Sequence, residues 1–124
     1  MTITHFKELM VWQQAMELAV NVYKVTDAYP RSELFVLTSQ TRKSAISIPS
    51  NIAEGCSRRS TPSFINHVHI ALGSEAELFT QLELALRLGL ATREQLAHVF
   101  AALQSVGKMM NALATSLEAT RTGD

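Results

Sequence analysis

The sequence predicts an all-α fold, an antiparallel up-down-up-down four-helix bundle, on three observations. Apolar residues recur every three or four positions along four long segments, which is the spacing of an amphipathic helix. Hydrophobic residues make up 47% of the chain and charged residues only 18%, with three prolines and five glycines in 124 residues. Short turns separate the segments, so helices that follow one another are expected to pack antiparallel.

These patterns set the expected boundaries. A chain of this length supports one core and is too short for two. The polar C-terminal residues contain no apolar anchor. We therefore expect a single domain, residues 1–124, with helices at 6–27, 33–55, 62–88 and 93–117 and a flexible tail at 118–124.

The segment 6–27 carries two apolar faces instead of one. The first face consists of Leu9, Trp12, Met16, Ala19 and Tyr23, and the second of Val11, Leu18, Val22 and Val25. A helix in a four-helix core needs only one such face. The extra face is therefore expected to pack against another subunit.

The segment 33–55 combines a helix-breaking residue with a polar stripe. Pro49 removes a backbone donor within the helical pattern, which predicts a kink there, and Gly55 is expected to end the helix. The stripe, at helical spacing, consists of Gln40, Ser44, Ser47, Asn51 and Glu54. A similar polar row, Ser74, Glu77 and Gln81, follows the segment 62–88. Two polar rows on helices expected to be neighbours predict hydrogen bonds between them.

Two glycines and a capping box complete the helix pattern. Gly73 lies inside the third helical segment, where glycine is unfavourable, so a close helix crossing is expected there. Gly89 is expected to end that helix. Thr92 with Gln95 three residues later forms a capping box that opens the fourth helix.

Charge and cysteine content narrow the function classes. Eleven basic residues balance eleven acidic ones, so no overall field attracts nucleic acid or an anionic membrane. The single cysteine, Cys56, excludes an internal disulfide and suits a reducing compartment. The sequence has neither a secretory signal pattern nor an apolar stretch long enough to span a membrane. We expect a cytoplasmic protein.

Nothing in the sequence has the pattern of a catalytic or metal centre. The paired Glu-x-x-His motifs of di-metal bundles are absent, and His67 and His69 are two residues apart, which directs them to different sides of a helix. We therefore expect no enzyme activity, no catalytic residues, no metal and no cofactor. One alternative is an enzyme or small-ligand binder that uses a buried Glu54/Glu77 cluster, since buried carboxylates acquire shifted pKa values. The simpler interpretation is that both carboxylates fix helix packing.

Four basic residues near the second helical segment form a candidate phosphate contact. They are Arg42, Lys43, Arg58 and Arg59. A strip of this size on a neutral protein is more often a solvated surface, but repetition around an oligomer would make it multivalent.

Two motifs resemble one protein family. The stretch SIPSNIAEG at residues 47–55 and the pattern GS-x-x-E-L-x-T-Q-L at residues 73–82 occur together, with LMVW at residues 9–12. Together they resemble the family named for proteins encoded by intervening sequences within bacterial 23S rRNA genes, over nearly the whole chain. A more distant similarity is to the accessory variability protein of diversity-generating retroelements, a basic protein that binds reverse transcriptase and nucleic acid.

The resemblance implies a ring-shaped homopentamer of four-helix bundles without known catalytic activity. It implies a non-catalytic binding or scaffold module whose partner is itself and also nucleic acid or a nucleic-acid enzyme, with no membrane partner. A pure scaffold for another protein is the remaining alternative, and the neutral charge of this chain weakens a nucleic-acid role. The polar residues would then form buried hydrogen bonds within or between subunits: Gln40, Ser47, Asn51, Glu54, Glu77 and Gln81.

Overall fold

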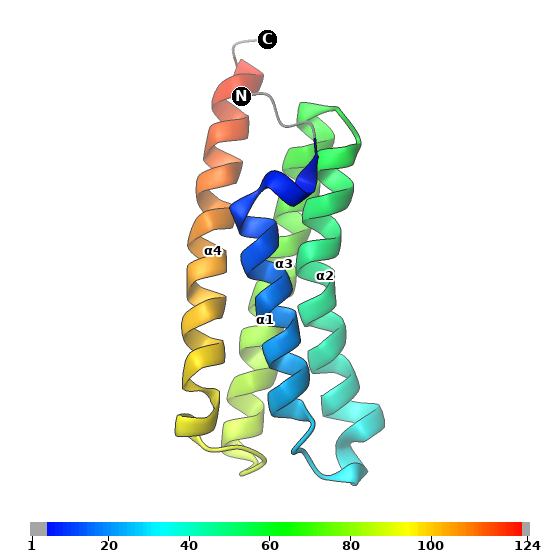
Figure 1. Ribbon diagram of the computed structural model, residues 1–124, viewed down its shortest axis with the longest axis vertical. Coiled ribbons are helices and arrows are strands. Elements are labelled where there is room, and N and C mark those ends of the chain that lie inside the picture. Colours follow the sequence, from blue (N-terminus) through cyan, green and yellow to red (C-terminus); the bar gives the residue numbers. More distant parts are fainter. Residues whose placement is uncertain (1–4, 123–124) are drawn as a thin grey trace.

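The computed structural model describes residues 5–122, and in this range the chain forms four α-helices and no β-strand. The helices are α1 (Met10–Thr26), α2 (Ser39–Ser57), α3 (Thr61–Arg87) and α4 (Arg93–Thr122). All four run roughly parallel to the long axis of the molecule (Figure 1). The predicted all-α, four-helix fold is confirmed.

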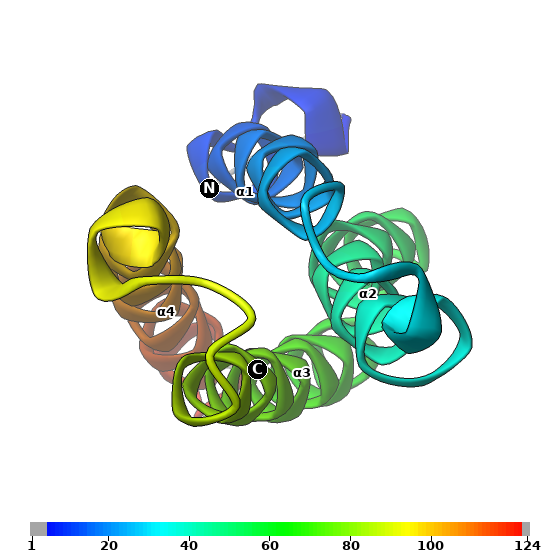
Figure 2. The same ribbon diagram turned by 90° about the horizontal axis from the view of Figure 1, so that it is seen from below.

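Apolar side chains from every helix fill the space between them. Helix α1 packs on α2, α2 on α3, α3 on α4, and α4 on α1, so the four surround a common centre (Figure 2). The large side chains that are fully buried there include Leu18, Ile48, Ile52, Leu78, Leu82, Leu96, Leu103 and Met110. Each contributes about 1.5–3 kcal/mol by leaving water. Of the two apolar faces of the first helix, the one with Val11, Leu18 and Val22 enters this core.

The first helix begins later than predicted. A 3-10 turn, η1 (Phe6–Glu8), comes first, and Leu9 in extended conformation (φ −78°, ψ 123°) separates it from α1. Side chains stabilise this break because the Gln13 Nε2 donates to the Lys7 carbonyl at 2.8 Å and the Lys7 N–H donates to His5 Nδ1 at 3.2 Å. Periodicity alone does not reveal such a break, since Leu9 still packs against the core.

The second helix also differs from its predicted bounds of 33–55. A 3-10 turn (Arg31–Glu33) and a π-helical segment (Leu34–Thr38) precede α2. The wider π turn buries Leu37 while leaving Phe35 89% exposed. Helix α2 continues through the buried Pro49 without interruption, and the kink at Pro49 stays a prediction.

Gly55 does not end α2, which continues to Ser57. The left-handed conformation falls instead on Arg59 (φ 56°). Gly55 is buried because α3 approaches closely: a Cβ there would lie 2.7 Å from the His67 Cβ. The close crossing expected at Gly73 therefore occurs at Gly55, since nothing lies within 4 Å of a Cβ built at Gly73.

The end of α3 and the beginning of α4 agree with the sequence prediction, but the end of α4 does not. Gly89 has φ +74° after α3, and the Thr92–Gln95 capping box is confirmed by reciprocal bonds of 2.9 and 3.1 Å. The predicted tail is wrong for residues 118–122, which continue α4. In this last part of α4 the Thr120 Oγ1 donates to the Ser116 carbonyl, and Arg121 lies 4.0 Å from the Glu118 carboxylate. Residues 123–124 lie outside the described range.

Candidate functional site

A chain of hydrogen bonds joins α2 to α3 along the predicted polar rows. The Ser47 and Ser74 hydroxyls lie 2.7 Å apart, and Ser74 is buried. Asn51 Nδ2 donates to the Ser47 carbonyl at 2.9 Å and to the Ser47 hydroxyl at 3.0 Å. These bonds satisfy polar groups that would otherwise be costly between two packed helices.

His67 extends this network on α3. The Asn51 amide nitrogen already donates to Ser47, so Asn51 Oδ1 accepts, and His67 Nδ1 at 3.1 Å carries the proton that it donates. The other ring nitrogen, Nε2, lies 3.6 Å from Glu54 Oε2. Glu54 also lies 3.8 Å from Arg58 one turn later. The network thus runs from a buried hydroxyl to surface charges.

Three of the six predicted network residues take part, and three lie elsewhere. Ser47, Asn51 and Glu54 belong to the network. Gln40 and Glu77 are exposed, and Gln81 is half-buried with an Oε1 that has no partner among the described residues. Contacts of these three with another subunit stay a prediction.

The carboxylates of Glu54 and Glu77 do not form a buried cluster. Ser47 faces Ser74, and Asn51, one turn further along α2, faces His67 further back along α3, so these two helices run in opposite directions. Glu54 and Glu77 therefore lie toward opposite ends of the pair of helices. Glu77 is about 15 Å along α3 from His67, the residue that Glu54 faces. Both carboxylates are exposed.

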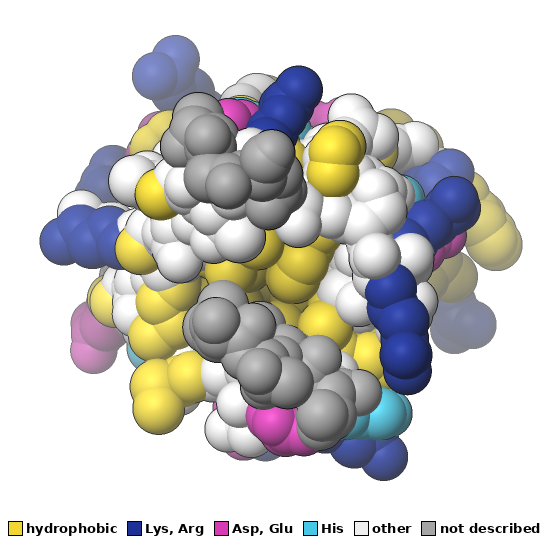
Figure 3. All heavy atoms as spheres, turned by 90° about the horizontal axis from the view of Figure 1, so that it is seen from above, with side chains coloured by type: hydrophobic (Ala, Val, Ile, Leu, Met, Phe, Trp, Pro, Cys, Tyr) yellow, Lys and Arg dark blue, Asp and Glu magenta, His cyan; other side chains and the backbone are white. Residues whose placement is uncertain are grey.

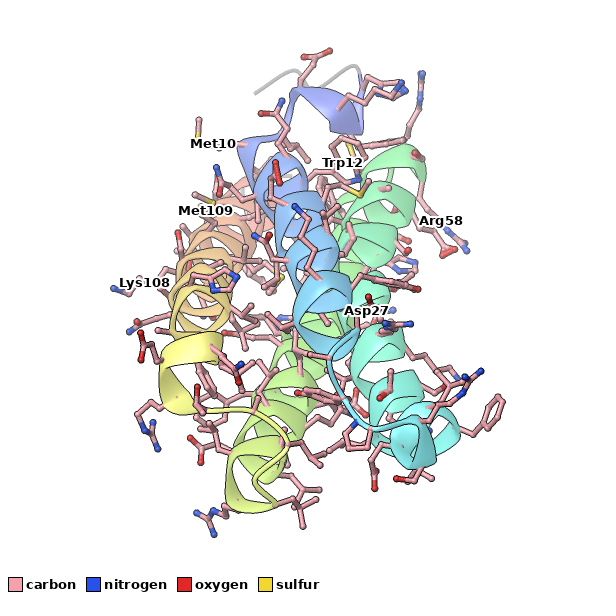
Figure 4. All side chains as sticks on the ribbon, turned by 60° about the horizontal axis from the view of Figure 1, so that its bottom comes forward. Met10, Trp12, Asp27, Arg58, Lys108 and Met109 are labelled. Carbon is pink, nitrogen blue, oxygen red and sulfur yellow. The ribbon has the colours of Figure 1, made fainter. Side chains whose placement is uncertain are left out.

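The four basic residues form two separate groups instead of one strip. Arg42 and Arg58 stand about 24 Å apart along α2. Arg42 Nη2 lies 3.8 Å from the carboxylate of Asp27, which Figure 4 labels together with Arg58. Seen from above, Lys and Arg side chains stand around the edge of the molecule, with several close together on the right (Figure 3). Lys43 and Arg59 are exposed.

Arg42 is committed to contacts within the chain. Its Nε donates to Thr26 Oγ1 at 2.9 Å, and its guanidinium carbon lies 4.5 Å from the centroid of the Tyr23 ring. Its Nη2 donates to the Tyr23 carbonyl at 3.4 Å. Arg42 therefore covers the C-terminal end of α1, where a cation is favourable, and is less available to phosphate than predicted.

The first apolar face of α1 is partly exposed, at Met16 and Tyr23, and lines a groove between α1 and α2. The groove has a volume of about 600 Å³. Met16, Val20, Tyr23 and Ile46, which line it, are each 41–46% exposed. Figure 4 labels Trp12 near its upper end. Side chains of this size seldom gather on an exposed surface without a partner.

A second groove, of about 790 Å³, lies between α3 and α4. Phe79, which is half-exposed, and Phe100 form its aromatic part, with ring centroids 5.6 Å apart. Glu75 lies beside them, and burial raises the pKa of its carboxyl above the usual value. The carboxylate rests against the α4 backbone at Gly107, where a Cβ would overlap it. In the sequence, Glu75 stands in the apolar row of α3, between Ala71 and Leu78. This position was the signal that its carboxylate is half-buried.

The described residues add no reactive or metal centre. Burial raises the pKa of the Cys56 thiol, and the Glu8 carboxylate adds to the rise, so the neighbouring arginines do not produce a thiolate. Within residues 5–122 no three His, Cys, Asp or Glu side chains gather as metal ligands. None of the described helices is long and apolar enough to cross a bilayer.

The protein is a four-helix bundle that has two apolar grooves and a row of hydrogen bonds between α2 and α3. Residues 7–112 match the 23S rRNA-intervening sequence protein family, and the chain belongs to this family. It is similar to a crystal structure of a protein of unknown function from the S23 ribosomal protein family of Bacteroides thetaiotaomicron VPI-5482. The two are 30% identical, the match covers 85% of this chain and 98% of the other, and the TM-score is 0.76. No curated protein matches.

Proposed function

We propose that this protein is a non-catalytic, homo-oligomeric helical module of the cytoplasm that acts by binding, with nucleic acid or a nucleic-acid enzyme as its partner class. The observation that carries the proposal is the α1–α2 groove, whose Met16, Val20 and Tyr23 side chains are left in water in a single chain. Covering such a surface releases free energy in proportion to the apolar area buried. The lone, half-buried Cys56 is consistent with a reducing compartment.

The proposed assembly is a ring-shaped homopentamer of antiparallel up-down-up-down bundles. The colour ramp of Figure 1, which reverses along the long axis from each helix to the next, supports this path for the chain. A ring with rotational symmetry needs two different surfaces on each copy. The two grooves, one on α1–α2 and one on α3–α4, meet that need.

The repetition of a few basic side chains around a ring favours nucleic acid as the partner. Arg59 is exposed at the end of α2, next to Arg58, and Lys43 is exposed near its beginning. Two or three cations per copy bind phosphate weakly, but five copies act together. The similar protein from Bacteroides thetaiotaomicron is assigned by its name to the S23 ribosomal protein family.

The binding experiment uses a fluorescent single-stranded RNA at two salt concentrations. Phosphate contacts release counterions, so binding should weaken at least about tenfold between roughly 50 and 200 mM salt. The Arg58→Ala/Arg59→Ala double variant should bind less tightly, while Glu94→Ala, a change on an exposed turn of α4, serves as its control. No binding at either salt concentration would remove nucleic acid as the partner and favour the protein-scaffold alternative.

An enzyme or ligand binder based on Glu54 and Glu77 has less support. The two carboxylates are exposed and apart, and Glu54 faces His67 and Arg58. A catalytic pair must converge on one reacting group. We therefore keep the non-catalytic proposal.

A further inference from the structure

Two apolar grooves lie on opposite flanks of the bundle. Seen along the axis, α1 and α2 form one flank and α3 and α4 the other (Figure 2). The first groove is lined by flexible and aromatic side chains such as Met16 and Tyr23, and the second by Phe79 and Phe100. Methionine adapts its shape to an incoming aromatic ring, so these linings are suited to each other.

Each groove contains one formally charged side chain, and the two charges are opposite. Lys24 is the charged residue in the lining of the α1–α2 groove, and Glu75 is the charged residue in the lining of the α3–α4 groove. Neither forms an ion pair with any residue that the structure describes. A half-buried carboxylate without a cation is unfavourable, and a cation delivered into its groove would relieve the cost.

We infer that the α3–α4 groove of one copy packs on the α1–α2 groove of a second copy, with Glu75 of the first paired to Lys24 of the second. The inference rests on the proposed homo-oligomer and names its contact surfaces. The half-exposed Phe79 side chain of the α3–α4 groove would pack on the apolar lining of the α1–α2 groove. The contact joins two different surfaces, so it repeats from copy to copy as a ring requires.

Charge reversal tests the pair directly. Lys24→Glu places two carboxylates in contact, and Glu75→Lys places two ammonium groups there. Each single variant should raise the dissociation constant of the assembly by about tenfold or more. The Lys24→Glu/Glu75→Lys double variant restores opposite charges and should return the dissociation constant to within about threefold of the wild type. The readout is the mass by light scattering across a dilution series.

The controls separate this inference from the proposed function. A wild-type protein with the mass of one chain contradicts the proposed homo-oligomer itself. A wild-type oligomer whose assembly survives both single reversals, or is not restored in the double variant, overturns only the Lys24–Glu75 contact. Glu94→Lys reverses a charge outside both grooves and should leave the mass unchanged.

A second variant keeps the test decisive if Glu75→Lys loses its helical circular dichroism. Glu75→Gln keeps the shape of the side chain and removes its charge. If the pair forms, Glu75→Gln and Lys24→Glu both weaken assembly. Wild-type assembly in both variants overturns the contact.

Discussion

The guanidinium of Arg42 on α2 lies over the ring of Tyr23 on α1, with 4.5 Å between the guanidinium carbon and the ring centroid. The same side chain donates to Thr26 Oγ1, one turn of α1 further on, at 2.9 Å. Thr26 is buried, and its hydroxyl donates in turn to the Val22 carbonyl at 2.7 Å. Arg42 therefore fastens the end of α1 to the beginning of α2.

Arg42→Ala should destabilise the fold. The variant loses a cation–π contact and a charge-assisted hydrogen bond, so we expect the free energy of unfolding to fall by about 1–2 kcal/mol. Lys43→Ala is the matched control, because Lys43 is exposed and its removal should change stability by less than about 0.5 kcal/mol. Urea denaturation measures both. Equal effects of the two variants would mean that Arg42 has no special structural role.

Asn51→Leu should break the hydrogen-bond chain between α2 and α3. His67 Nδ1 would lose its acceptor and Ser47 its donor, so we expect a loss of about 1–3 kcal/mol in the free energy of unfolding. Gln40→Leu is the control, since Gln40 is exposed and outside the network. A stable Asn51→Leu protein with unchanged mass would contradict the structural role of the network.

Alanine should have opposite effects at Gly55 in α2 and Gly73 in α3. Gly55→Ala forces a Cβ to within 2.7 Å of the His67 Cβ and 3.3 Å of the Phe64 Cα, so we expect a loss of about 1–3 kcal/mol. Gly73→Ala meets open space and should gain up to about 1 kcal/mol from the better helix propensity of alanine. Thermal unfolding of the two variants gives both signs. A stabilised Gly55→Ala would show that α2 and α3 separate easily.

Tyr29→Phe should stabilise the protein, increasingly so at alkaline pH. The Tyr29 hydroxyl is buried without a partner among the described residues, and its removal should gain about 1 kcal/mol at neutral pH. Burial raises the Tyr29 pKa above 10.0. The folded state then holds the proton that the unfolded state releases, so wild-type stability falls as the pH rises past 10.0.

Tyr29→Phe has no hydroxyl at this position, so its stability does not show this fall above pH 10. Its advantage should grow by up to about 1.4 kcal/mol per pH unit above pH 10 until the folded-state pKa is passed. Urea denaturation at pH 7, 10 and 11 measures the difference. A difference that does not depend on pH would contradict the buried, neutral state of the Tyr29 hydroxyl.

Helix content was predictable because apolar periodicity dominates each segment. Leu18, Ile52 and Leu103 are buried at the helical spacing that the sequence displays. Irregular turns were not predictable, because their cause is a side chain elsewhere: Gln13 holds the break before α1. Spacing also could not separate Gly55 from Gly73, since only the packed neighbour decides which one needs to be glycine.

The sequence indicates which polar residues take part in the candidate site, but not which partner each residue contacts. Ser47 and Asn51 belong to a polar row, and they do meet a polar row on α3. The register between the helices decides which partner each one finds, so Glu54 meets His67 and not Glu77. Arg42 was predicted as a phosphate contact because its partners on α1, sixteen and nineteen residues away, are not visible from sequence spacing.

The mass of the wild-type protein in solution, measured by light scattering on a sizing column, tests the central claim most directly. We expect a mass near five times the 13.7 kDa of one chain, the mass of a homopentamer in which the α1–α2 and α3–α4 grooves cover each other. A mass of one chain at micromolar concentration, with both grooves in water, would contradict it.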